Sequence, residues 1–96
     1  MPNYHISAEA DDDLLDIARY TIEAWGIKQS LKYKEELMDC FQNLAENPDI
    51  GRDASHFSRD LLRYSYKAHA IFFKQTENEI LIIRVLGQKM DLEGQF

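Results

Sequence analysis

Residues 62–91 read LRYSYKAHAIFFKQTENEILIIRVLGQKMD, and this stretch decides the fold. It holds three strand-like runs, at 62–66, 69–74 and 80–86, separated by short polar turns. Connections this short require antiparallel hairpins. The last run, ILIIRVL, is nearly all apolar and rich in β-branched residues. We therefore expect it to be a central strand that helices cover on at least one face.

Two helices are expected before this stretch. Ser7 is a natural N-cap for the first, in which apolar residues recur at three- and four-residue steps: Leu14, Ile17, Ala18, Ile22 and Trp25. The second helix starts near Lys28 and keeps this periodicity to Glu46, where Asn47 and Pro48 stop it. Because only Gly26 and Ile27 separate the two, we expect an antiparallel helical hairpin.

The remaining segments complete the architecture. Residues 4–6 alternate and predict a first strand, whereas residues 48–58 are a polar loop with turn formers. The predicted order is β-α-α-β-β-β, an α+β fold in which the helical hairpin packs on a small, mainly antiparallel sheet. A chain of 96 residues of this kind makes a single domain, residues 1–96.

Composition limits the classes of function. The net charge is −6, and the first 56 residues hold five Lys or Arg against twelve Asp or Glu, so we expect no direct binding of nucleic acid. The single cysteine, Cys40, fits a reducing compartment and falls on an apolar helix face, as a core residue does. No secretory signal and no apolar run of about 20 residues is present, which predicts a cytoplasmic protein away from the membrane.

Few side chains suggest chemistry. The four glycines are isolated and the histidines and cysteine show no paired spacing, so no phosphate loop, cofactor or metal site is expected. His69, at the start of a strand, is conceivable as a general base but is better interpreted as structural. Trp25 is expected to close the core at the hairpin rather than to bind a ring-shaped ligand.

Three basic residues lie on or beside the predicted strands: Arg63, Lys74 and Arg84. If they share the uncovered face of the sheet, they form a cationic cluster that could hold phosphate or a carboxylate-rich partner. The alternative is that each side chain extends separately to solvent. Spacing alone leaves both readings open.

The same segments resemble the ParE-type toxins of bacterial toxin–antitoxin modules, within the RelE/ParE superfamily. The similar pieces appear in the family's order along nearly the whole chain: Ile17-Ala18-Arg19-Tyr20, Trp25-Gly26, the run from Leu44 to Pro48, Gly51-Arg52, Leu62-Arg63, the strand from His69 to Phe73, Arg84-Val85-Leu86 and Met90-Asp91. One departure is Gly87, where the family often has a histidine or another polar residue.

The resemblance implies a toxin that inhibits DNA gyrase and so replication, is neutralised by a ParD-like antitoxin, stabilises a plasmid or chromosome, and is an inhibitor rather than an enzyme. One alternative is a RelE-like endonuclease that cuts messenger RNA on the ribosome, although the tail after Leu86 lacks the Tyr or His that could act as acid or base. The other is a non-toxic relic that only binds antitoxin.

The C-terminal tail is the predicted contact with the target. It follows a central strand, so its first residues should be held rigidly while its end is free. Lys89 brings a charge, and Met90 brings an adaptable apolar contact, which together suit a protein target. The predicted target-binding residues are Gln88, Lys89, Met90, Asp91 and Phe96. The alternative left open is that Met90 and Leu92 fold back over the sheet.

Overall fold

The computed structural model describes residues 3–88 and 92–96. Along the chain they form β1 (Asn3–Ile6), α1 (Ala8–Trp25), α2 (Ile27–Glu46), the 3-10 turn η1 (Pro48–Ile50), β2 (Arg52–Asp53), β3 (Leu62–Tyr66), β4 (His69–Gln75), β5 (Glu79–Gly87) and the 3-10 turn η2 (Glu93–Gln95). The predicted β-α-α-β-β-β order is confirmed. One element is additional, because the two-residue strand β2 lies in the segment that the sequence predicted as loop.

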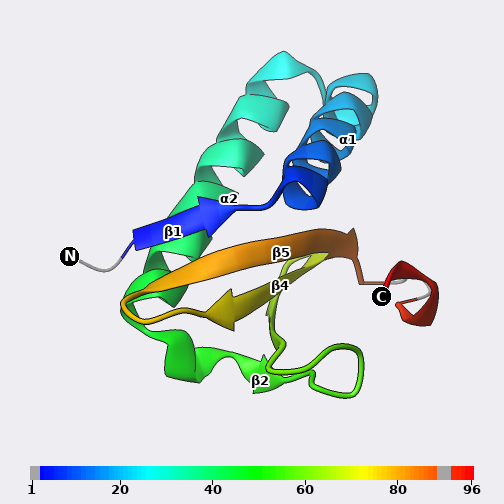
Figure 1. The fold of residues 1–96 in the computed structure, drawn as a ribbon. Coiled ribbons are helices and arrows are strands. Elements are labelled where there is room, and N and C mark those ends of the chain that lie inside the picture. Colours follow the sequence, from blue (N-terminus) through cyan, green and yellow to red (C-terminus); the bar gives the residue numbers. More distant parts are fainter. Residues whose placement is uncertain (1–2, 89–91) are drawn as a thin grey trace.

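The strands form one sheet in the order β1-β5-β4-β3-β2, and both helices lie on one side of it (Figure 1). β1 runs parallel to β5, whereas the other neighbours are antiparallel. The predicted central position of the last strand is confirmed, since β5 lies between β1 and β4. A β-bulge at Ile83 of β5, opposite Phe72 and Phe73, shifts the register of the β4–β5 pair.

Two residues define the helical hairpin. The Ser7 hydroxyl accepts a hydrogen bond from the backbone N–H of Ala10 (3.0 Å) and donates to the carbonyl of Ile83 (2.7 Å), so the helix cap also attaches α1 to β5. Gly26 has φ +94° and ψ 169°, a conformation that is essentially restricted to glycine. This single residue therefore ends α1 and allows α2 to start at once.

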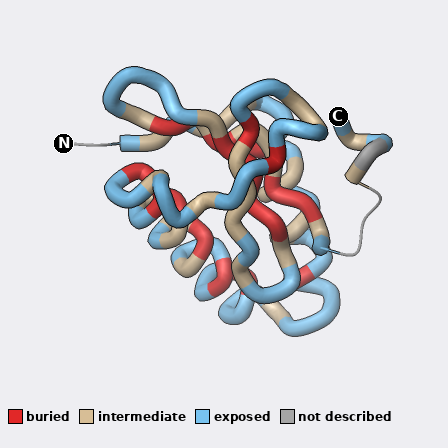
Figure 2. Tube along the Cα trace, turned by 90° about the horizontal axis from the view of Figure 1, so that it is seen from below, coloured by how far each residue is buried: buried red, intermediate tan, exposed pale blue. Residues whose placement is uncertain are grey.

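Both faces of the sheet are covered. On the helix side, Leu37, Phe41 and Leu44 of α2 pack with Ile71 and Phe73 of the sheet. The second face has its own buried cluster: Ala54, Leu61, Ala70, Phe72 and Leu86, with Phe57, Ile83 and Leu92 packed against it. Figure 2 shows buried segments in the facing sides of the helices and in the strands. An uncovered second face, the condition stated for a cationic cluster, is therefore not present, because the 54–61 loop and the C-terminal segment lie on it.

Gly51 explains why the chain turns so closely under the sheet. A Cβ atom at this position would lie 2.5 Å from the ring of Phe73, which is fully buried. Only glycine allows η1 and β2 to approach the sheet this closely. The turn then brings Arg52 directly opposite Arg63 in the β2–β3 pair.

Candidate functional site

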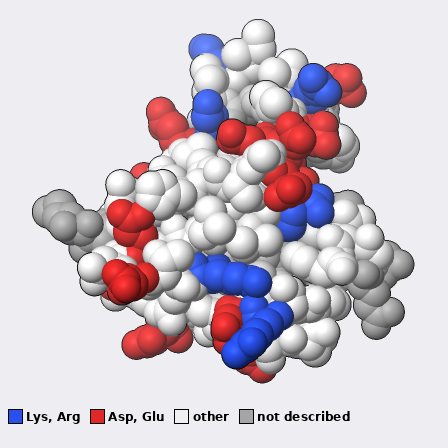
Figure 3. Space-filling model, in the orientation of Figure 1, with Lys and Arg blue, Asp and Glu red and all other residues white. Residues whose placement is uncertain are grey.

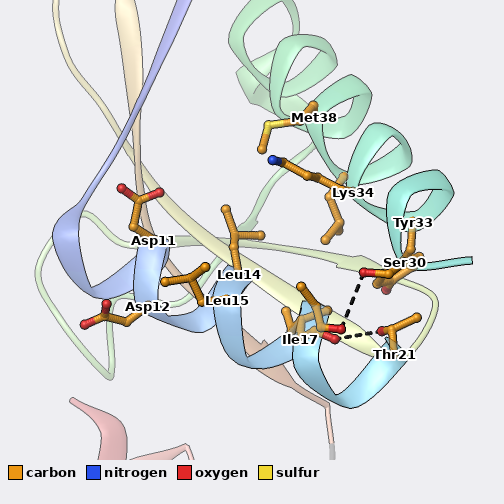
Figure 4. Close-up of a pocket in the computed structure, with 12 residues that line it drawn as sticks. Asp11, Asp12, Leu14, Leu15, Ile17, Thr21, Ser30, Tyr33, Lys34 and Met38 are labelled. Carbon is orange, nitrogen blue, oxygen red and sulfur yellow. Dashed lines mark hydrogen bonds between the residues drawn. The ribbon is translucent and has the colours of Figure 1, made fainter. Parts of the chain in front are cut away.

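An apolar groove runs between the two helices. It has a volume of about 440 Å³ and is lined from both sides of the hairpin: Asp11, Asp12, Leu14, Leu15, Ile17, Ala18, Thr21, Ser30, Tyr33, Lys34, Leu37 and Met38. In Figure 4 the apolar side chains of α1 face Met38 and Lys34 of α2 across the opening. The groove ends where the Ser30 hydroxyl donates to the Ala18 carbonyl at 3.4 Å.

The two walls of this groove carry opposite charge. Asp11 and Asp12 lie on the α1 wall, whereas Lys34 lies on the α2 wall. In Figure 3 acidic atoms gather over the first turns of α1, and basic atoms lie both over the helical hairpin and over the sheet. A ligand that fills the groove therefore meets an apolar floor between an acidic and a basic margin.

Several large apolar side chains of the hairpin remain in solvent. Trp25 is 73% exposed and Leu15 57%, and the others are Tyr20, Ile22, Ile27 and Leu31. The expectation that Trp25 closes the core is wrong. Instead Trp25 lines a hollow of about 440 Å³ beneath the hairpin tip with Tyr20, Tyr33 and the β3–β4 turn. Exposed apolar side chains gathered on one part of a small domain are typical of interaction faces.

His69 has a structural partner. The Tyr33 hydroxyl lies 2.7 Å from His69 Nδ1. Burial raises the pKa of Tyr33 to about 12, so we assign its O–H as the donor and Nδ1 as the acceptor. Burial also lowers the pKa of the His69 imidazole, which favours its neutral form. The lone pair that a general base would use is therefore occupied, in agreement with the structural interpretation.

A second polar cluster fastens the β3–β4 turn to α2. The Glu36 carboxylate accepts hydrogen bonds from the Tyr66 hydroxyl (2.6 Å) and from Lys67 Nζ (2.5 Å). The bond from Lys67 is the main reason that the pKa of Glu36 is lowered, and the same contact raises the pKa of Lys67. Cys40 nearby is half-buried against the core, as predicted, and burial raises the pKa of its thiol.

Arg84 is engaged by an acidic partner. Its guanidinium donates Nε and Nη2 to the two Asp13 carboxylate oxygens at 2.8 and 2.9 Å, and Asp13 also accepts the backbone N–H of Val85 at 3.0 Å. The two side chains are only 19% and 11% exposed. This bidentate pair connects α1 to β5, and the hydrogen bond to Asp13 raises the pKa of Arg84.

The three predicted basic residues share one face of the sheet but have separate partners. Arg63 and Arg84 are the neighbours of Phe72 on either side, and Lys74 lies two residues further along β4. Lys74 Nζ donates to the Ser58 hydroxyl at 3.2 Å, whereas the Arg63 guanidinium lies 5.6 Å from the centre of the Phe72 ring. The structure thus removes Arg84 from the proposed cationic cluster.

Arg63 opens instead into a cleft beside β2. This cleft has a volume of about 670 Å³ and is lined by Ile50, Arg52, Asp53, Ala54, His56, Phe57, Arg63, Tyr64 and Ser65. Sequence reasoning missed Arg52 and His56, because both lie in the segment interpreted as loop. The Arg52–Arg63 proximity depends on pairing by a strand of two residues, too short to produce a periodic signal.

The tail is held at both described ends. Gln88 donates its backbone N–H to the Ala68 carbonyl (3.0 Å) and its side-chain amide to the Lys67 carbonyl (2.5 Å). The Phe96 ring packs on Phe72 and Phe57, with centroids 5.0 and 5.6 Å apart, respectively. The expected free end is thus wrong, and the fold-back alternative is correct for Leu92. Lys89, Met90 and Asp91 lie outside the described residues.

Residues 3–88 and 92–96 contain no group of three or more His, Cys, Asp or Glu side chains arranged to hold a metal ion. No helix of the described chain has the length and apolarity needed to cross a membrane.

A family profile and two relatives of similar sequence are all described as ParE toxins. The profile of the family described as "ParE toxin of type II toxin-antitoxin system, parDE" matches residues 4–92. Toxin ParE1 of Caulobacter vibrioides is 32% identical over 91 residues, which cover 95% of this chain and 94% of that one. Toxin ParE of Escherichia coli is 31% identical over 93 residues, covering 96% and 90%.

The fold agrees with this relationship. A solved structure described as the chromosomal ParDE TA system from P. aeruginosa superimposes with a TM-score of 0.77 at 17% identity, covering 91% of this chain and 96% of that one. The family match over nearly the whole sequence confirms the resemblance to ParE-type toxins that the strands and helices of this chain showed. The chain belongs to the ParE toxin family of type II toxin–antitoxin systems.

Proposed function

We propose that this toxin inhibits DNA gyrase, and thereby replication, in the bacterial cytoplasm, and that a ParD-like antitoxin silences it from the groove between α1 and α2. The observation that carries the proposal is this apolar groove on a ParE-family domain, surrounded by exposed Leu15, Ile22 and Leu31. Membership in the family and the fold shared with a ParDE system support an antitoxin partner.

The groove suits an amphipathic helix. Two packed helices with an apolar channel between them provide the surface that a third helix fills in helix-in-groove recognition. The charges of the walls set its polarity, since basic side chains of the antitoxin would face Asp11 and Asp12 and an acidic one would face Lys34. Arg63 and Lys74 lie on the Phe72 face of the sheet, opposite to the helices, so the proposed antitoxin site does not include them.

The contact with gyrase is proposed for the C-terminal tail, at Gln88, Lys89, Met90, Asp91 and Phe96. Gln88 is anchored by two hydrogen bonds to the β3–β4 turn. Phe96 is 37% exposed, so one side of its ring packs on Phe57 and Phe72 while part of it remains available to a partner. A fixed start and a partly exposed aromatic end fit protein binding, and His69 is already hydrogen-bonded, so we propose an inhibitor rather than an enzyme.

Leu15→Glu tests the antitoxin seat. Leu15 lines the groove and is mostly in solvent, so a carboxylate there should cost little stability while it places a charge in the apolar contact. We expect antitoxin affinity to fall by about a hundredfold, from a buried anchor worth about 3 kcal/mol. Toxicity should remain, so that cells expressing the variant with antitoxin form filaments and arrest.

Asn78→Glu is the matched control, because Asn78 is exposed in the β4–β5 turn, outside both the groove and the cleft beside β2. It should bind antitoxin like the original chain, as measured by calorimetry. Equal antitoxin affinities for Leu15→Glu and the original chain would contradict the proposal that the antitoxin binds in the α1–α2 groove. An immediate stop of translation with cut messages on induction would contradict gyrase as the target.

A further inference from the structure

A pair of arginines meets in the cleft beside β2 without an acidic partner. Arg52 and Arg63 are directly opposite in the β2–β3 register and both line the cleft. Like charges in this position destabilise a strand pair. Nevertheless, among residues 3–88 and 92–96, neither arginine forms an ion pair, although the chain as a whole carries 17 acidic residues against 11 Lys and Arg.

The carboxylate in the cleft lining, that of Asp53, has other hydrogen-bond partners. The Asp53 oxygens accept the backbone N–H and the hydroxyl of Ser55, both at 3.1 Å, which lowers the pKa of this carboxyl. Asp53 is thus anchored by its own loop rather than by the arginines. Arg63 is further held over the fully buried Phe72 ring, so its guanidinium is positioned before any ligand arrives.

The remaining walls of the cleft suit a protein ligand. Phe57, Tyr64 and Ile50 supply aromatic and aliphatic surface next to the two arginines, and His56 adds a further polar group. Aromatic residues and arginine are enriched at protein interfaces, and the guanidinium fork matches a carboxylate with two parallel hydrogen bonds.

Nucleic acid fits this site less well. A phosphate backbone presents a charge at every step and requires a track of cations. On this face Asp13 neutralises Arg84, and Lys74 is hydrogen-bonded to Ser58 outside the cleft lining. The two arginines therefore form one local site for an anionic group rather than an extended cationic track for a nucleic-acid backbone.

From this geometry we infer that the Arg52–Arg63 cleft is a second interaction site, which binds an acidic protein segment through a carboxylate flanked by an apolar side chain. It shares no residue with the groove between α1 and α2. Its occupancy is therefore independent of the proposed antitoxin seat, and the two can be tested separately.

The test is a titration of the isotope-labelled, full-length chain with a blocked Phe-Glu-Glu-Phe peptide, followed by amide NMR shifts. The shifts should concentrate at residues 50–57 and 63–65. A Phe-Gln-Gln-Phe peptide should leave these amides in place, because it lacks the carboxylates. No shift with the acidic peptide, or equal shifts with both peptides, overturns the inference. Tighter binding of a short oligothymidylate at the same amides also overturns it, in favour of nucleic acid.

Substitutions locate the contact. Arg52→Gln, at an exposed edge position, should weaken the acidic peptide by about tenfold, the loss of one charge-assisted contact. Arg63→Gln should weaken peptide binding by a similar factor. If this substitution unfolds the chain, the affinity of Arg52→Gln alone tests the inference. Arg59→Gln is the matched control, since Arg59 is exposed in the same loop but outside the cleft. A similar loss in Arg59→Gln would show that net charge alone acts, which overturns the site.

Discussion

At the scale of single residues, the pair formed by Asp13 and Arg84 is expected to stabilise the fold strongly. It joins α1 to β5 through two short bonds between mostly buried groups, and Asp13 also satisfies the backbone N–H of Val85. Removing one partner of such a pair leaves the other charge desolvated. We predict that Asp13→Asn lowers the free energy of unfolding by about 3 kcal/mol in urea titrations.

Asp16→Asn provides the comparison for this prediction. Asp16 lies one turn later on α1 and forms a 3.8 Å pair with Arg19, in which both side chains are 77% exposed. Such a surface pair contributes little, so its removal should change stability by less than about 0.5 kcal/mol. Equal effects of the two substitutions would mean that the Asp13–Arg84 pair is not structurally important.

His69 predicts a dependence of stability on pH. Burial holds the pKa of its imidazole below the ordinary 6.5, so the unfolded chain binds this proton more readily than the folded chain. The contribution is fully present above about pH 6.5 and is lost as the pH falls from there through the folded pKa. We predict that His69→Asn flattens this part of the stability–pH curve, measured by urea unfolding at a series of pH values.

Tyr33→Phe separates burial from hydrogen bonding in that experiment. It removes the donor to Nδ1 but leaves the ring of His69 enclosed. Stability should fall by about 1 kcal/mol at neutral pH, while the slope below pH 6.5 persists, because burial is what lowers the pKa. If Tyr33→Phe also flattened the slope, the hydrogen bond rather than burial would control the titration.

At the scale of elements, the C-terminal segment is a cover for the second face of the sheet. Leu92 and Phe96 lie over Phe72, and Gln95 reaches Arg84 through two long contacts of 3.4 and 3.5 Å. We predict that deleting residues 92–96 lowers the free energy of unfolding by about 2 kcal/mol, because it exposes about one large apolar side chain. Circular dichroism should show unchanged helix content. An unchanged urea midpoint would indicate that the segment is free in solution.

The helices and main strands could be predicted because their signals are local. Ser7 and Gly26 define the ends of α1 by capping chemistry. Alternation predicts β3, and short apolar runs bounded by polar turns predict β4 and β5. Periodicity, however, identifies an apolar side without saying what covers it. Leu37 is buried whereas Leu31 and Trp25 on the same hairpin are exposed, since the hairpin extends beyond the sheet.

The contacts that define the candidate sites are nonlocal, which is why the sequence did not predict them. Arg84 meets an aspartate 71 positions earlier, and Arg52 meets Arg63 only through β2. Such pairs depend on the sheet register and on how α1 crosses it. The pattern of residues along the sequence contains neither the sheet register nor the path of α1 across the sheet.

At the scale of the whole molecule, the domain separates its surfaces. The helical hairpin presents the antitoxin groove, the C-terminal segment lies by the end of β5, and the arginine cleft lies beside β2 at the opposite edge of the sheet from β1 (Figure 1). This separation allows the α1–α2 groove to be altered without disturbing the surface proposed to reach gyrase. Neutralisation and toxicity should therefore be separable by substitution.

The most direct measurement is a supercoiling assay with purified gyrase and relaxed plasmid, in parallel with a translation reaction in which message integrity is followed. The account predicts that the original chain and Leu15→Glu both block supercoiling and leave messages intact, and that antitoxin restores supercoiling only for the original chain. Unimpaired supercoiling together with messages cut on the ribosome would contradict it.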